Sequence, residues 1–126
     1  MELRDYFEDA TGIGMLATAD TEGKVNVAIY ARPHFLGDND DEVAFVMNDR
    51  LSHRNVDSNP SAAYLFVEKS EGYAGKRLYL TKIREETDQD KIQSLRRRKL
   101  PPECDEGAGT RFLVYFHVDD IRPLVG

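Results

Sequence analysis

A chain of 126 residues is long enough for one domain with one hydrophobic core, so we expect residues 1–126 to form a single domain. Hydrophobic residues make up 40% of the chain and charged residues 32%, which is typical of a globular protein and excludes a disordered one. The net charge of −6 at pH 7 excludes broad electrostatic binding to nucleic acid or to anionic membranes.

The N-terminal segment has the spacing of a short amphipathic helix. Leu3, Tyr6 and Phe7 lie at positions i, i+3 and i+4, so they share one helix face. Gly12 is a natural stop for this helix, because glycine favours the backbone that ends one.

Alternating apolar and polar side chains then predict two strands joined by a hairpin. The first strand covers 13–20, the turn 21–24 and the second strand 25–36. Pro33 has no N–H for a ladder hydrogen bond, so it interrupts the second strand and leaves Arg32 at a strand end or a kink.

A third strand leads directly into a helix. The strand covers 43–48 and the helix covers about 50–58, with Asn48 or Asp49 as the expected N-cap. The Asn-Pro pair at 59–60 ends the helix, because proline cannot continue it.

The remaining chain predicts three more strands and one more helix. The helix opens with acidic residues and closes with basic ones, as the helix dipole favours. We expect strands at 61–68, 76–83 and 110–118, the helix at 87–100 and a loop at 101–109.

Six mostly hairpin-linked strands with short helices predict a mainly β fold, a six-stranded antiparallel barrel that is closed or split. Both faces of the strands at 43–48 and 61–68 are apolar. One face fills the barrel and the other needs a cover, which a helix or a second copy of the chain can supply. A second copy covers it more completely, so the sequence predicts a homodimer.

Four side chains that can bind an anion gather in the first turns of the helix at 50–58. They are Arg50, Ser52, His53 and Arg54. Free backbone N–H groups and the positive end of the dipole favour an anion at a helix start. The planar fork of arginine suits phosphate oxygens, and Arg32 would close the site from the neighbouring strand. The pattern predicts a site for a compact terminal phosphate monoester.

A second interpretation stays open at this point. Asp49 and Asp57 lie close to the two arginines of the helix, and arginines beside aspartates commonly form solvated surface pairs.

The sequence gives little support for a metal site or a reactive thiol. His34, His53 and His117 have no metal-ligand spacing, so no metal site is predicted, although haem held by one histidine remains an alternative. The single cysteine, Cys104, excludes an intrachain disulfide and lies in an acidic loop that makes it a poor nucleophile.

The acidic N-terminus does not have the pattern of a signal peptide and no apolar run is long enough to cross a membrane, so we expect a cytoplasmic protein without a membrane partner.

Two stretches together resemble a known family. The segments "MLATADTEGKVNVAIY" and "VAFVMNDRLSHRNVDSNPSAAYLF" are similar to the pyridoxamine 5′-phosphate oxidase-like proteins, the FMN-binding split barrels. The shared pattern is an apolar-Ala-Thr strand, a glycine turn, a second strand, and a third strand that runs into a helix ending in N-[aliphatic]-x-x-N-P. The resemblance covers about residues 13–83.

The resemblance implies a split-barrel homodimer with FMN in the groove between subunits. It places the FMN phosphate near the junction of third strand and helix, at Arg50 and Ser52, with Arg32 as a basic contact from the second strand. It also implies that the backbone of Met47 and Asn48 touches the flavin, and His53 or Arg54 would help to hold the phosphate.

The function that follows is an FMN-binding flavoprotein, expected to act as an oxidoreductase with an unidentified small-molecule substrate. The C-terminal "DDIRPLVG" has no Arg-x-His segment of the kind that true pyridoxamine phosphate oxidases use to hold substrate, so that specific reaction is not predicted. The alternative is a non-enzymatic ligand-binding or haem-binding module on the same barrel.

Overall fold

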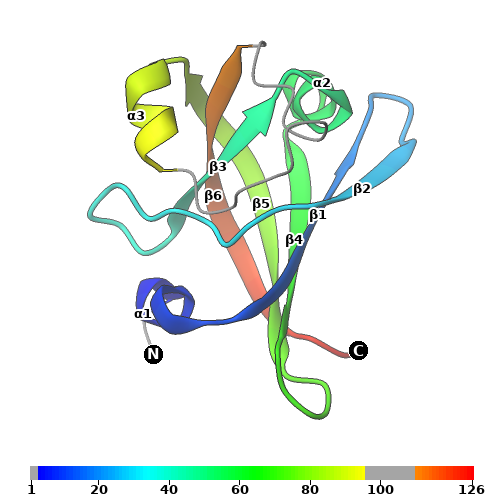
Figure 1. The fold of residues 1–126 in the computed structure, drawn as a ribbon. Coiled ribbons are helices and arrows are strands. Elements are labelled where there is room, and N and C mark those ends of the chain that lie inside the picture. Colours follow the sequence, from blue (N-terminus) through cyan, green and yellow to red (C-terminus); the bar gives the residue numbers. More distant parts are fainter. Residues whose placement is uncertain (1–2, 96–109) are drawn as a thin grey trace, which may run out of the picture.

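The computed structural model describes residues 3–95 and 110–126. The predicted loop at 101–109 with Cys104, and residues 96–100 of the predicted helix at 87–100, lie outside the described residues. Figure 1 shows the elements in chain order: α1 (Leu3–Asp9), β1 (Gly12–Ala19), β2 (Val25–Ile29), β3 (Glu42–Asn48), α2 (Leu51–Ser58), β4 (Ser61–Glu68), β5 (Gly75–Glu86), α3 (Gln89–Ser94) and β6 (Arg111–Pro123).

The strands form one antiparallel sheet in the order β2-β1-β4-β5-β6-β3. The sheet curls into a half-barrel, with α1 at one end and α2 at the other (Figure 1). The predicted mainly β, six-stranded antiparallel split barrel is confirmed. None of the helices in the described part of the chain has the length and apolar character needed to cross a membrane.

The inner side of the sheet holds an aromatic core. The ring centroid of Phe45 lies 4.9 Å from that of Tyr64, 5.9 Å from that of Phe116 and 6.1 Å from that of Tyr30. Burial of large aromatic side chains is the main favourable contribution to such a core, and edge-to-face contacts add to it.

Helix α1 closes one end of this core. Its buried residues Leu3 and Phe7 pack against the aromatic cluster. At its N-terminus the Asp40 carboxylate accepts the backbone N–H groups of Leu3 at 2.6 Å and Arg4 at 2.8 Å. The helix ends at Asp9, three residues before the expected stop, because the chain must become extended to pair β1 with β4.

The outer side of the sheet is covered over one half only. On that half, α3 covers the outer side chains of β3 and β6, where Ile92 packs with Ala44, Leu113 and Tyr115. The expectation that a second copy would cover both apolar strands is therefore corrected for β3, whose cover is a helix of the same chain.

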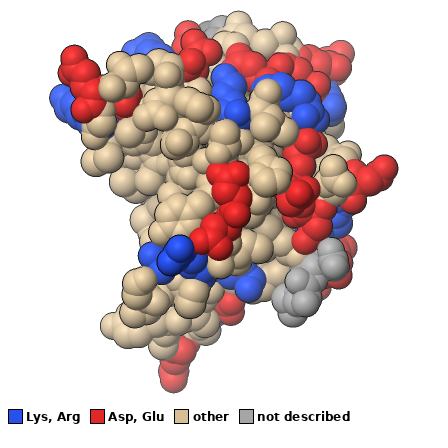
Figure 2. Space-filling view, turned by 180° about the vertical axis from the view of Figure 1, so that it is seen from behind, with Lys and Arg blue, Asp and Glu red and all other residues tan. Residues whose placement is uncertain are grey.

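The other half of the outer side is apolar and exposed. We call it the β2 face: Ile13, Val25, Val27 and Ile29 are 56%, 75%, 61% and 58% exposed. The strand register places Val27 beside Ala17 and Ile29 beside Met15, so these side chains form one continuous surface. Figure 2 shows a broad area without charged residues on the side of the molecule where β1 and β2 lie. A contiguous apolar area of this kind is a candidate interaction surface.

Candidate functional site

Helix α2 begins where β3 ends and carries most of the predicted anion-binding side chains. Its N-cap residue is Arg50, which has extended backbone angles (φ −135°, ψ −170°) and makes no side-chain capping hydrogen bond. The prediction of Asn48 or Asp49 as the N-cap is wrong, because the Asp49 carboxylate faces His53 instead. The start of α2 is thus suited to an external anion rather than to a capping side chain.

Two asparagines fix α2 on the sheet. The side-chain amide of Asn55 donates to the Thr18 hydroxyl of β1 at 3.0 Å, and both residues are buried. The Asn59 side chain donates to the carbonyl of Asp20 at 3.3 Å and accepts the backbone N–H of Ser61 at 3.1 Å. The two asparagines of the N-[aliphatic]-x-x-N-P pattern are therefore anchoring residues, and they hold the second turn and the C-terminal end of α2 on the sheet.

Ser52 faces the sheet rather than solvent. It is 5% exposed, and its hydroxyl accepts a hydrogen bond from the Asn26 side chain of β2 at 3.3 Å. This contact connects the first turn of α2 to the strand that carries the β2 face.

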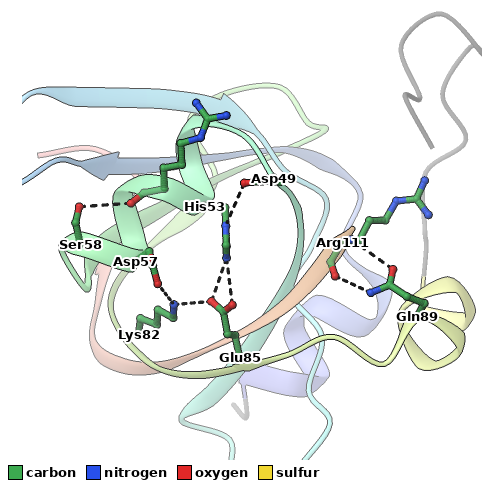
Figure 3. A network of polar contacts seen from close by, with 9 residues as sticks. Asp49, His53, Asp57, Ser58, Lys82, Glu85, Gln89 and Arg111 are labelled. Carbon is green, nitrogen blue, oxygen red and sulfur yellow. Dashed lines mark hydrogen bonds and ion pairs between the residues drawn. The ribbon is translucent and has the colours of Figure 1, made fainter. Parts of the chain in front are cut away.

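His53 lies at the centre of a polar network (Figure 3). Its ring stacks on Phe112 of β6, with ring centroids 3.8 Å apart and planes inclined by 10°. Its Nε2 lies 3.1 and 3.3 Å from the two carboxylate oxygens of Glu85, and its Nδ1 lies 3.8 Å from an Asp49 oxygen. The stack and the Glu85 contact together fix the orientation of the imidazole.

Strand β5 supplies both Glu85 and Lys82 to this network. Lys82 Nζ lies 2.6 Å from Glu85 and 3.6 Å from Asp57 of α2 (Figure 3). Residues three apart in a regular strand point to opposite faces. Here the register of β5 against β6 shifts between Lys82 and Arg84, so Ile83 is an extra residue. This bulge turns Lys82 and Glu85 toward the same helix.

The charges of the network hold Glu85 ionised. Burial by itself would raise the pKa of the Glu85 carboxyl, but hydrogen bonds from Lys82 and His53 outweigh burial, and the pKa is lowered from 4.5. Because the folded-state pKa lies below the unfolded one, ionised Glu85 stabilises the fold above pH 4.5, and that contribution is lost as the pH falls through the folded-state pKa.

This linkage gives a testable expectation for Glu85→Gln. The difference in free energy of unfolding between the wild type and the variant should shrink toward zero as the pH is lowered from about 5 to about 3. Urea unfolding at a series of pH values measures it. Glu71→Gln, an exposed change in the β4–β5 hairpin, is the matched control. A difference that stays constant over this acid range would contradict the assignment of the Glu85 contacts.

The structure brings six of the seven predicted site residues to one end of the barrel. Met47 is buried at the end of β3, and Asn48, Arg50 and Arg54 are exposed. The six residues are Met47, Asn48, Arg50, Ser52, His53 and Arg54.

Arg32 is not brought to this end. Its Nη1 donates to the carbonyls of Phe7 at 2.8 Å and Glu8 at 2.9 Å, in the last turn of α1. A guanidinium there is favoured by the negative end of the helix dipole. Because α1 and α2 lie at opposite ends of the molecule (Figure 1), this arginine is separated from the other six residues.

Sequence reasoning did not identify Lys82, Glu85, Phe112 and Asn26 as parts of the site. They lie on β5, β6 and β2, far along the chain from α2. The available signal was the pair of opposite charges at Lys82 and Glu85, three residues apart at the end of β5. Such a pair lies on one face of a strand only when a bulge is present.

Comparisons with known proteins agree on the fold. No protein-family model matches the chain, and no curated protein matches its sequence. An FMN-binding protein from Syntrophomonas wolfei superposes with a TM-score of 0.72 at 16% sequence identity, over 99% of this chain and 85% of that one.

Two further solved structures are similar over nearly the whole chain. HupZ from Group A Streptococcus superposes with a TM-score of 0.67 at 21% identity, over 98% of this chain and 91% of that one. A Clostridium acetobutylicum protein of the pyridoxinephosphate oxidase family, related to general stress protein 26, superposes with a TM-score of 0.63 at 15% identity, over 94% and 83%. At these identities the likeness establishes the fold, which is the split barrel that the resemblance implied.

Proposed function

We propose that this protein binds FMN and acts as a flavin-dependent oxidoreductase. The observation that carries the proposal is the start of α2: an arginine N-cap without a side-chain cap, followed by Ser52, His53 and Arg54, on a barrel shared with an FMN-binding protein. In this proposal Arg50, Ser52, His53 and Arg54 hold the phosphate, and the backbone of Met47 and Asn48 lies beside the flavin.

The residues present fit a phosphate. Arg50 and Arg54 are exposed and four residues apart, and the planar fork of each guanidinium suits the oxygens of a phosphate. The cations Arg50, Arg54 and Lys82 stand against the carboxylates of Asp49, Asp57 and Glu85, so the surroundings are nearly neutral before a ligand binds. When bound, FMN supplies the electron transfer, and the barrel supplies binding, orientation and exclusion of water.

The proposal includes a homodimer. The β2 face exposes four aliphatic side chains, each more than half accessible, and the Ser52–Asn26 contact joins the start of α2 to the opposite side of the same strand. A second copy docked on the β2 face would bury these side chains, with strand β2 between the subunit boundary and the start of α2. FMN would lie in the groove between the two subunits.

Absorbance of the purified protein tests the cofactor. We expect a flavin band at about 450 nm, either as isolated or after adding FMN and removing the excess. A Soret band instead would indicate haem, and protein that stays colourless after incubation with FMN would overturn the proposal.

Replacing one arginine tests the position of the phosphate. Arg50→Ala should weaken FMN binding by about 1.5–3 kcal/mol, which is roughly 10- to 150-fold, because a charge-assisted contact is lost. Riboflavin, which has no phosphate, should bind the variant and the wild type equally. Quenching of flavin fluorescence measures both ligands.

Arg122→Ala is the matched control, since Arg122 is exposed and lies on the C-terminal end of β6. Equal losses for FMN and riboflavin in Arg50→Ala would mean that the phosphate does not lie at α2.

A further inference from the structure

The two nitrogens of His53 have different surroundings. The Nε2 side is fixed: Glu85 is within hydrogen-bond distance, its side chain is 26% exposed, and Lys82 behind it is 13% exposed. The Nδ1 side is less constrained, although the His53 side chain itself is only 10% exposed: Asp49 is 61% exposed, and its nearest oxygen, at 3.8 Å, is beyond hydrogen-bond distance. One anion is thus built into the site, and the other is a surface side chain that can turn away.

The contacts of the His53 ring restrict its orientation. Phe112 lies parallel to the imidazole at 3.8 Å and restricts it to one plane, while Glu85 fixes its rotation in that plane. Nδ1 is consequently directed toward the N-terminal end of α2, where the phosphate would lie according to the proposed function.

A phosphate at this position needs a proton on Nδ1. Nε2 already faces the Glu85 carboxylate and serves as its donor, so a donor at Nδ1 as well requires the doubly protonated, cationic imidazole. The ring contacts Asp49 from the entry to α2 and Glu85 from β5. Lys82 and Asp57 continue the network behind Glu85, and Arg50 and Arg54 are sequence neighbours of His53. From β6 it meets the uncharged ring of Phe112.

We propose that His53 binds the FMN phosphate through Nδ1 as an imidazolium, that Glu85 is the positioning residue for it, and that Asp49 competes with the phosphate for the same nitrogen. This inference rests on the proposed function and adds to it that FMN binding takes up a proton at His53. The protein thereby prefers the phosphorylated flavin more strongly as the pH falls.

The experiment compares FMN and riboflavin over pH, because their affinity ratio isolates the phosphate. Fluorescence titrations between about pH 6 and pH 8 give the ratio for the wild type and for His53→Gln. The FMN phosphate itself loses a proton near pH 6, and the ratio in His53→Gln contains that ligand contribution alone. We therefore divide the FMN-to-riboflavin affinity ratio of the wild type by that of His53→Gln at each pH. This quotient should be about tenfold smaller at the higher pH than at the lower pH.

Two further variants test the partners. Glu85→Gln keeps a hydrogen-bond acceptor but removes the charge, so the pH dependence should move to lower pH; a purely structural role would lower affinity without moving the profile. Asp49→Asn, an exposed change that leaves the core untouched, should raise FMN affinity about threefold at pH 7 and leave riboflavin unaffected.

The outcomes separate the two proposals. If the wild type binds FMN no better than riboflavin, the proposed function and this inference both fall. If FMN is preferred but His53→Gln has the wild-type pH profile, or Asp49→Asn does not strengthen FMN binding, the inference alone is overturned.

Discussion

Phe45→Ala is expected to lower the free energy of unfolding by about 3–5 kcal/mol, because the truncation opens a cavity among three aromatic rings. Phe45 is 2% exposed, and its ring contacts those of Tyr30, Tyr64 and Phe116. These rings come from β4, β6 and the segment after β2, so the remaining core cannot close the gap by moving one element. Urea unfolding at 25 °C measures the loss.

Tyr73→Ala serves as the matched control, because it also truncates an aromatic side chain but at a position that is 86% exposed. We expect a change within about 0.5 kcal/mol there. A comparable loss in both variants would mean that the Phe45 cluster is not the centre of the core.

Val27→Glu is expected to convert the proposed dimer to a monomer. Val27 lies in the middle of the β2 face, and in a dimer formed through that face each copy would bury one unpaired carboxylate. Such burial costs at least about 3 kcal/mol, which raises the dimer dissociation constant by more than roughly a hundredfold. Analytical ultracentrifugation at micromolar concentration measures the shift.

Thr21→Glu adds the same charge in the exposed hairpin turn beside β2 and should leave the dimer intact. A wild type that sediments as a monomer would contradict a dimer through the β2 face. A Val27→Glu variant that stays dimeric would place the interface elsewhere.

The elements β3, α2 and β4 were predictable because their signals are local. The strand expected at 61–68 is β4 with the same bounds, and the strand at 43–48 differs from β3 only by Glu42. The helix expected at 50–58 corresponds to α2, which begins one residue later, at Leu51. Alternation, the Asn-Pro stop and the glycine turn each act over a few residues, so they are readable without knowledge of the tertiary structure.

The ends of β2, β5 and β6 were not predictable in the same way. β2 stops at Ile29 although alternation continues to Arg32, because the chain then leaves β1 and only an isolated bridge from His34 to Ala44 follows. β5 and β6 extend to Glu86 and Pro123, beyond their apolar patterns. Their pairing continues through charged residues, and backbone hydrogen bonds leave no mark on side-chain periodicity.

The candidate site shows the same limit. The side chains on α2 were identified because they are neighbours in sequence, and the structure keeps them together. The roles of Arg32 and Glu85 depend on partners 24 or more residues away, at the end of α1 and at His53. Nothing in the spacing around either residue specifies which distant group it meets.

The way α1 is held has a consequence for the order in which the molecule assembles. A seven-residue helix is too short to persist alone, and its ends are satisfied by Asp40 and Arg32, which lie in the segment between β2 and β3. The beginning of the chain must therefore wait for later-synthesised residues before it can take its place. When it detaches, the neighbours of Phe7, including Tyr64 and Phe66, are uncovered together. Docking of the N-terminus thus shields this part of the aromatic interior from water.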